Sequence, residues 1–111
     1  MLERDVEKNL RIQAKAIGCR CMKFVSPGTA GVPDRIVLIP GGHIVFVELK
    51  APKKKERALQ LIIQDRLRAM GFTVFSSVDG TERIQEVIDY CKEVMTDGKG
   101  LHTTRLPAIR N

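Results

Sequence analysis

The sequence predicts an α/β domain in which a mixed sheet is flanked by helices, with the element order α-β-β-β-α-β-α. The main observation is a pair of short apolar runs, at residues 36–39 and 44–47, separated by a Pro-Gly-Gly-His turn. Continuous apolar runs of this length are typical of strands buried on both faces, and the turn predicts that they pair antiparallel. Apolar residues recur at helical spacing on both sides of this hairpin, at 2–17 and 56–70, and a third apolar run at 72–78 follows the second helix.

The composition sets bounds on the class of protein. With 111 residues and 43% hydrophobic side chains, the chain is long enough for one domain with a modest core. Nineteen Lys and Arg against thirteen Asp and Glu give a formal charge of +6, which favours polyanionic partners such as nucleic acid. Many basic proteins bind no nucleic acid, so the charge alone does not define the function.

Cysteine usage and hydropathy predict an intracellular, cytoplasmic protein. Cys19, Cys21 and Cys91 are odd in number and lack the spacing of a zinc site, so we expect reduced thiols. No apolar run approaches the length of a membrane span, and Glu3 and Asp5 stand where a signal peptide would be apolar. We therefore expect no membrane segment.

The first helix and the first strand each carry a candidate functional residue. In the helix at 2–17, Glu3 and Glu7 lie four residues apart and share one face, so either could approach the hairpin. Both could equally be exposed acids that are favourable near a helix N-terminus. Residues 20–25 alternate loosely and predict a strand, in which Lys23 points either toward the site or toward water.

The hairpin itself predicts a metal site. Antiparallel pairing places the start of one strand beside the end of the other, so Asp34 and Glu48 should meet at one end of the sheet. Glu48 and Lys50 are two residues apart and project from the same face. Crowded carboxylates repel unless a divalent cation neutralises them, and a nearby lysine can stabilise charge that develops on a phosphate. The trio fits phosphodiester hydrolysis, although solvated charges at a strand end would show the same spacing.

A basic run and a second helix follow the hairpin. Lys53, Lys54 and Lys55 form either a solvated surface or a phosphate contact beside the proposed site. The helix at 56–70 is expected to end at Gly71. Its predicted buried stripe consists of Leu59, Ile62, Ile63, Leu67 and Met70.

The last third of the chain completes the sheet. The strand at 72–78 is expected to run parallel to the third strand through a right-handed crossover, and residues 81–95 predict the final helix. Residues 96–111 hold few large apolar side chains and are expected to form a tail. The predicted domain therefore covers residues 1–95.

Several motifs along the chain carry a family resemblance. They are Glu7, Lys23-Phe24, Ser26-Pro27-Gly28, Gly31-Val32-Pro33-Asp34-Arg35, Phe46-Val47-Glu48-Leu49-Lys50-Ala51-Pro52, and Gln60 eleven residues before Gly71. This set resembles the PD-(D/E)xK nuclease superfamily and, within it, the stand-alone phage form of the virus-type replication-repair nuclease (VRR-NUC) domain. The resemblance covers about residues 3 to 94.

The resemblance implies a restriction-endonuclease-like core and a Mg²⁺- or Mn²⁺-dependent DNA endonuclease. In such an enzyme Asp34, Glu48 and the backbone carbonyl of Leu49 hold the metal. Lys50 and Gln60 position the nucleophilic water, and Glu7 assists through a direct or water-mediated contact.

The same resemblance implies partners and an origin. It implies a homodimer that acts on branched DNA such as Holliday junctions, since a two-fold protein presents two sites to a two-fold junction. Candidate DNA-binding residues are Lys23, Arg35, Lys53, Lys54 and Lys55. A phage or bacterial source would fit the compact size.

Two other functions stay open at this point. The chain could be a non-catalytic DNA-binding module of a phage replication or packaging complex, or an enzyme that acts on RNA or free nucleotides. The absence of a P-loop and of zinc-finger spacing argues against an ATPase or a zinc-dependent binder. No recognition helix can be singled out, so sequence preference is not predicted.

Overall fold

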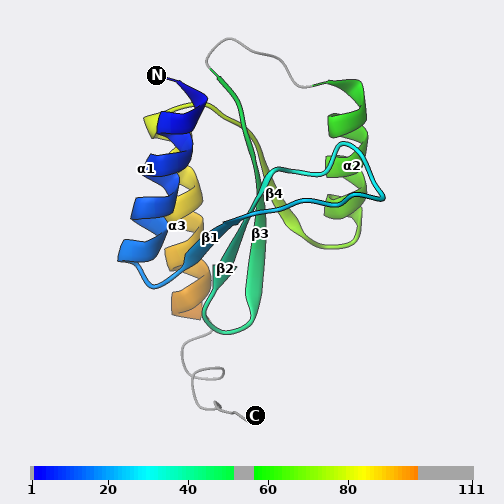
Figure 1. Cartoon of the computed structure of the whole chain (residues 1–111). Coiled ribbons are helices and arrows are strands. Elements are labelled where there is room, and N and C mark those ends of the chain that lie inside the picture. The colour runs from blue at the N-terminus through cyan, green and yellow to red at the C-terminus, as the bar shows by residue number, and fades with distance from the viewer. Residues whose placement is uncertain (1, 52–56, 98–111) are drawn as a thin grey trace.

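The computed structural model describes residues 2–51 and 57–97, and within them the predicted α/β fold and element order are confirmed (Figure 1). No helix in these two segments is long and apolar enough to cross a membrane. The elements are α1 (Glu3–Ala16), β1 (Arg20–Lys23), β2 (Arg35–Ile39), β3 (His43–Leu49), α2 (Ala58–Ala69), β4 (Thr73–Val78) and α3 (Thr81–Asp97).

The four strands form one mixed sheet in the order β1-β2-β3-β4. β1 pairs with β2 and β2 with β3 antiparallel, with Val37 opposite Val45 in the central pair. β4 lies parallel to β3, as the helical crossover predicts. β1 is therefore an edge strand, and β3, the longest strand, lies at the centre of the sheet.

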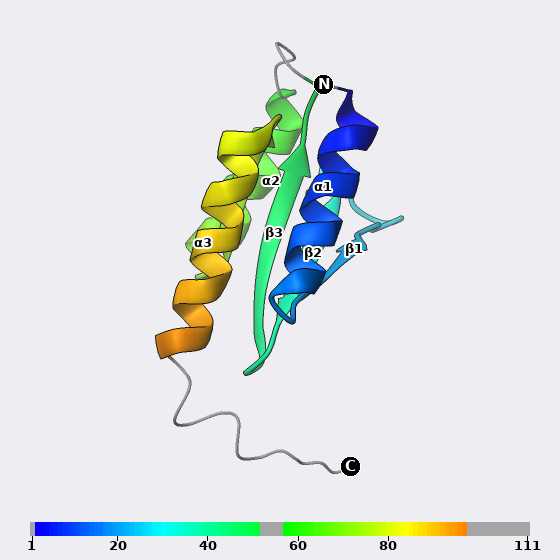
Figure 2. The same ribbon diagram turned by 90° about the vertical axis from the view of Figure 1, so that its left-hand side faces the viewer.

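The two faces of the sheet are covered unequally. Among the described elements, α1 and α3 lie side by side on one face, whereas α2 is the one helix on the other (Figures 1 and 2). The main core lies under the helix pair, where apolar side chains of both helices meet those of the central strands. Its fully buried members include Val6, Leu10, Val37, Val45, Val47, Ile84 and Val87.

The sheet face on which α2 lies is less buried than predicted, and two predictions are wrong there. Leu38 and Ile44 are 38% and 36% exposed, so the hairpin is not buried on both faces along its length. Leu59 and Ile62 in α2 are about half exposed, and Met70, which follows the last residue of α2, is 67% exposed, so the predicted buried stripe is wrong at these residues. A lone helix on a sheet buries only a narrow line of side chains, here Ile63 and Gln64.

All three cysteines are free and buried, in agreement with the expected reduced thiols. Cys21 lies in β1, Cys91 in α3, and Cys19 just before β1. All of them belong to the main core. The final helix α3 continues to Asp97, two residues beyond the domain boundary predicted at residue 95.

The pairing of β3 with β4 is irregular near the end of both strands. Val47 lies opposite Phe75 but Leu49 lies opposite Val78, so β4 holds one extra residue. Ser77, inside this irregular stretch, has a φ of 54°. Bulges of this kind bend a strand and redirect side chains, and this one lies next to Glu48.

Candidate active site

The structure brings Asp34 and Glu48 together at the end of the hairpin. The backbone N–H of Asp34 donates a hydrogen bond of 3.1 Å to Glu48 Oε1. The backbone N–H of Leu49 donates one of 3.1 Å to Asp34 Oδ1. Each carboxylate is thus fixed by the backbone of the opposite strand, in the arrangement that antiparallel pairing predicts.

Gln60, in the first turn of α2, joins the carboxylate pair to the lysine. Its Nε2 donates a hydrogen bond of 2.8 Å to Glu48 Oε2, and its Oε1 accepts one of 3.1 Å from Lys50 Nζ. Lys50 Nζ also lies 3.7 Å from Glu48 Oε2. The amide therefore holds the ammonium group at a fixed place beside the carboxylate, and α2 is the element that sets this place.

The site is poor in solvent. Glu48 is only 4% exposed, and burial raises the pKa of the Asp34 carboxyl, with the Leu49 N–H hydrogen bond acting in the opposite direction. Buried carboxylates disfavour their charged form, and a bound cation relieves this cost. The oxygen atoms of Asp34, Glu48 and the Leu49 carbonyl are the hard ligands that Mg²⁺ and Mn²⁺ prefer, so these residues fit such an ion.

The predicted third carboxylate lies apart from this pair. Glu7 Oε2 lies 3.5 Å from Arg35 Nε and 3.5 Å from Arg11 Nε. Among residues 2–51 and 57–97, no group of three His, Cys, Asp or Glu side chains is close enough to hold a metal ion. Of the two roles predicted for Glu7, the geometry is compatible with the water-mediated one.

The candidate DNA-binding residues differ in their surroundings. Lys23 is exposed at the end of β1, opposite Arg35 in the strand register. The Arg35 side chain is only 17% exposed, and its Nη1 donates a hydrogen bond of 2.8 Å to the Asp34 carbonyl. Arg35 thus links the backbone of Asp34 to the side chain of Glu7. The basic run at 53–55 lies outside the described residues.

A contact that the sequence did not predict joins the β1–β2 connection to α2. Gly31 has a φ of +88°, and a Cβ at this position would lie 2.9 Å from Leu59 Cγ and 3.2 Å from the Leu59 carbonyl oxygen. Only glycine fits this approach without strain. The only signal in the sequence is the glycine just before Val32-Pro33-Asp34.

Comparison with known proteins finds a similar sequence and a similar fold among nucleases and nuclease domains. The chain is 49% identical over 72 residues to "Putative nuclease p44" of Acyrthosiphon pisum secondary endosymbiont phage 1, a match that covers 65% of this chain and 77% of that protein. A solved structure described as a VRR_NUC domain is similar at a TM-score of 0.71 and 30% identity, covering 79% of this chain and 95% of that one. No protein-family model matches the chain.

Proposed function

Because the chain belongs to the VRR-NUC family of nuclease domains, we propose that it is a metal-dependent DNA endonuclease that hydrolyses phosphodiester bonds. The observation that carries the proposal is the hydrogen-bonded group of Asp34, Glu48, Lys50 and Gln60. Two carboxylates and a fixed ammonium group at one end of a sheet can support metal-dependent phosphodiester hydrolysis. The proposed nuclease domain extends to Asp97, where α3 ends, and the remainder of the tail predicted from residue 96 lies outside the described residues.

In this mechanism the carboxylates and the Leu49 carbonyl would hold the metal, and Lys50 acts on the reacting groups. When bound, Mg²⁺ or Mn²⁺ would supply Lewis-acid chemistry to the hydrolysis. Lys50 Nζ orients the attacking water and stabilises the negative charge of the transition state. Gln60 keeps Lys50 in place, because its Oε1 accepts the Lys50 hydrogen bond while its Nε2 is anchored on Glu48.

Glu7 and the basic residues act around this centre. Glu7 contributes through water, since its carboxylate is engaged by two guanidinium groups. Lys23 and the lysines at 53–55 contact the DNA backbone, with the salt dependence that phosphate contacts bring. Arg35 has the different role of positioning Asp34 and Glu7.

The substrate and the oligomeric state form the second part of the proposal. The enzyme acts as a homodimer on branched DNA such as Holliday junctions. Support for a dimer comes from the exposed side chains of Leu59 and Ile62 on α2 and of Met70 directly after it, each 47% exposed or more, on the sheet face that α2 covers. Large exposed apolar groups of this kind mark interaction surfaces.

The test is cleavage of labelled four-way junction, flap, duplex and single-stranded DNA with Mg²⁺, Mn²⁺ or EDTA. Wild type is compared with Asp34→Ala and Lys50→Ala, and the exposed residues Asp65 and Lys92 supply the matched controls Asp65→Ala and Lys92→Ala. We expect metal-dependent cleavage that both site variants lose and both controls keep. Binding of DNA without cleavage under any condition would overturn the enzyme assignment, and an RNA panel tests the remaining alternative.

A further inference from the structure

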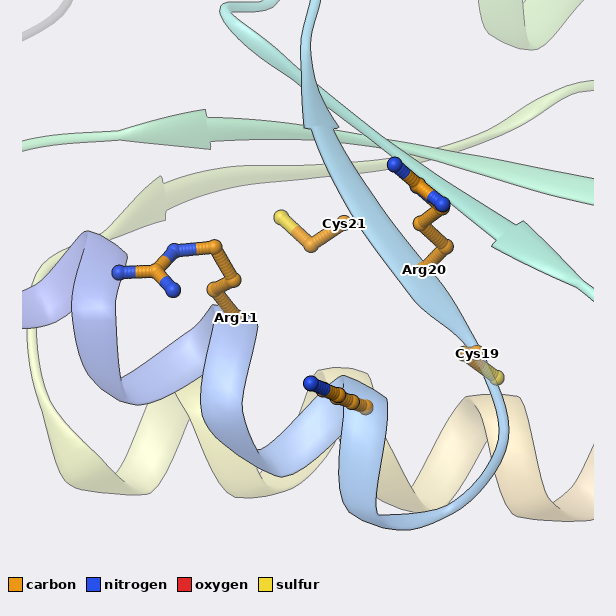
Figure 3. A pocket seen from close by; sticks show the side chains of 5 residues that line it. Arg11, Cys19, Arg20 and Cys21 are labelled. Carbon is orange, nitrogen blue, oxygen red and sulfur yellow. The ribbon is translucent and has the colours of Figure 1, made fainter.

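A cavity of about 380 Å³ opens between α1 and the edge strand β1 (Figure 3). Its lining consists of Arg11, Lys15, Cys19, Arg20 and Cys21. Arg11 and Lys15 are one turn apart on α1, both are exposed, and both line the cavity. The two cysteines are buried on the strand side of the cavity, and none of the five lining residues is acidic.

The cysteines add no negative charge to the cavity at neutral pH. Burial raises the pKa of the Cys21 thiol to about 11, and the charge of Glu7 acts in the same direction. Burial also raises the pKa of Cys19. Both thiols are therefore protonated near pH 7, and the charged groups that line the cavity are all cationic: Arg11 and Lys15 on α1 and Arg20 on β1.

A continuous series of charged groups connects this cavity to the candidate active site. The Arg11 guanidinium lies 3.5 Å from Glu7, which also contacts Arg35, and Arg35 donates to the Asp34 carbonyl. Two guanidinium groups share the one Glu7 carboxylate, so positive charge remains in excess beside the cavity. Lys15 has no ion pair among the described residues and adds to this excess.

We propose that this cavity binds a backbone phosphate of the nucleic-acid substrate, held by Arg11 and Lys15 at a distance from the scissile bond. The inference deepens the proposed nuclease function and rests on it. Lys15 lies two helical turns beyond Glu7, about 12 Å along the helix axis at 1.5 Å per residue. At about 3.4 Å of rise per nucleotide, the bound phosphate is three to four nucleotides from those next to Glu7.

The first experiment measures binding by fluorescence anisotropy, with a labelled 20-nucleotide single strand and the corresponding duplex in EDTA. The double variant Arg11→Gln/Lys15→Gln is compared with Arg66→Gln/Lys92→Gln, which removes the same charge from exposed positions on α2 and α3. At 0.1 M KCl we expect the dissociation constant to rise about tenfold in the first variant only. The slope of log affinity against log salt for duplex DNA should become shallower by about 1, the value for one lost phosphate contact.

A second experiment separates direct binding from an effect through Glu7. Lys15→Gln leaves the pair of Arg11 and Glu7 intact, so it should weaken binding in the same direction as the double variant. Circular dichroism melts check that each variant is folded. If only Arg11→Gln weakens binding, or if the α2/α3 control variant weakens it equally, the cavity is not a phosphate site.

A third experiment tests the distance from the reacting bond. Hairpin duplexes with stems of two, four, six and eight base pairs are titrated into wild type and the double variant. Wild-type affinity should increase at about six base pairs, and the variant should lack this increase. A loss of the increase in a protein that cleaves nothing would keep the phosphate site and remove the nuclease function. Intact cleavage with identical binding series would overturn the phosphate site alone.

Discussion

Gln60 is the residue through which α2 controls the position of Lys50. Its two side-chain ends contact Glu48 and Lys50 at 2.8 and 3.1 Å. An exposed helical glutamine has no signature of its own in a sequence, so this role could be inferred only from the family resemblance. The meeting of Asp34 and Glu48, in contrast, follows from the pairing of two short strands across a tight turn. Site residues on the hairpin were therefore predictable from pattern, and those on other elements were not.

Replacing Gln60 should affect catalysis more than stability. In Gln60→Ala, Lys50 loses its acceptor, and a misplaced catalytic group can cost about 100-fold in rate. We expect kcat to fall by about 10- to 100-fold, with a small change in melting temperature. Gln85→Ala, which removes an exposed glutamine on α3, is the control for cleavage assays and thermal melts. A Gln60→Ala enzyme with wild-type kcat would contradict the positioning role.

The buried carboxyl of Asp34 gives a pH-dependent prediction. Its pKa is raised by burial, so between its unfolded value near 3.8 and its folded value the native state binds more protons than the unfolded state. The Asp34 carboxyl therefore contributes to the free energy of unfolding at pH values below its unfolded pKa. This contribution is lost as the pH rises through the folded pKa. Asp34→Asn should therefore melt at a higher temperature than wild type at pH 7 in EDTA, and this difference should shrink toward pH 3.

Metal binding should reverse that order of stability. A cation that binds only the folded protein stabilises it by about 2.7 kcal/mol at 100 times its dissociation constant. Mn²⁺ should thus raise the melting temperature of wild type and leave that of Asp34→Asn nearly unchanged. A shift of equal size in both proteins, measured by differential scanning fluorimetry, would place the ion elsewhere.

At the scale of elements, α2 shows where pattern reading succeeds and where it fails. Its existence and approximate limits follow from apolar spacing and from the glycine at its end, Gly71. Its buried side does not, because Leu59 and Ile62 are about half exposed while the polar Gln64 is fully buried. Periodicity in a sequence shows that a helix has an apolar side. How much of that side is buried depends on which other elements pack against the helix.

The contact between the β1–β2 connection and α2 depends on Gly31. Gly31→Ala would place a Cβ against Leu59, in a backbone conformation that residues other than glycine rarely adopt. We expect this strain to lower the free energy of unfolding by about 1–3 kcal/mol. Gly28→Ala is the matched control, since a Cβ there meets nothing within 4 Å. Chemical denaturation should show a lower unfolding free energy for Gly31→Ala only. Equal stabilities would mean that the connection can move away from α2 without loss.

At the scale of the whole molecule, the unequal cover of the two sheet faces supports the proposed homodimer. Ile62→Glu would place a charge in the proposed interface, where burial without a partner is costly. Size-exclusion chromatography with light scattering should show a dimer for wild type and a monomer for Ile62→Glu. Ile12→Glu, at an exposed position on α1, is the control and should stay dimeric. A wild-type protein that is monomeric at all concentrations would contradict the dimer.

The three core cysteines have a practical consequence. Burial raises the pKa of Cys21 to about 11 and, with the neighbouring thiols, that of Cys91 to about 12. Only about one thiol in ten thousand or fewer is then ionised at pH 7, and alkylating reagents attack the ionised form. Cys19 and Cys21 line the cavity beside α1, whereas Cys91 is fully buried and becomes reactive only when α3 separates from the core. The rate at which Cys91 reacts with iodoacetamide therefore reports how often this part of the core opens.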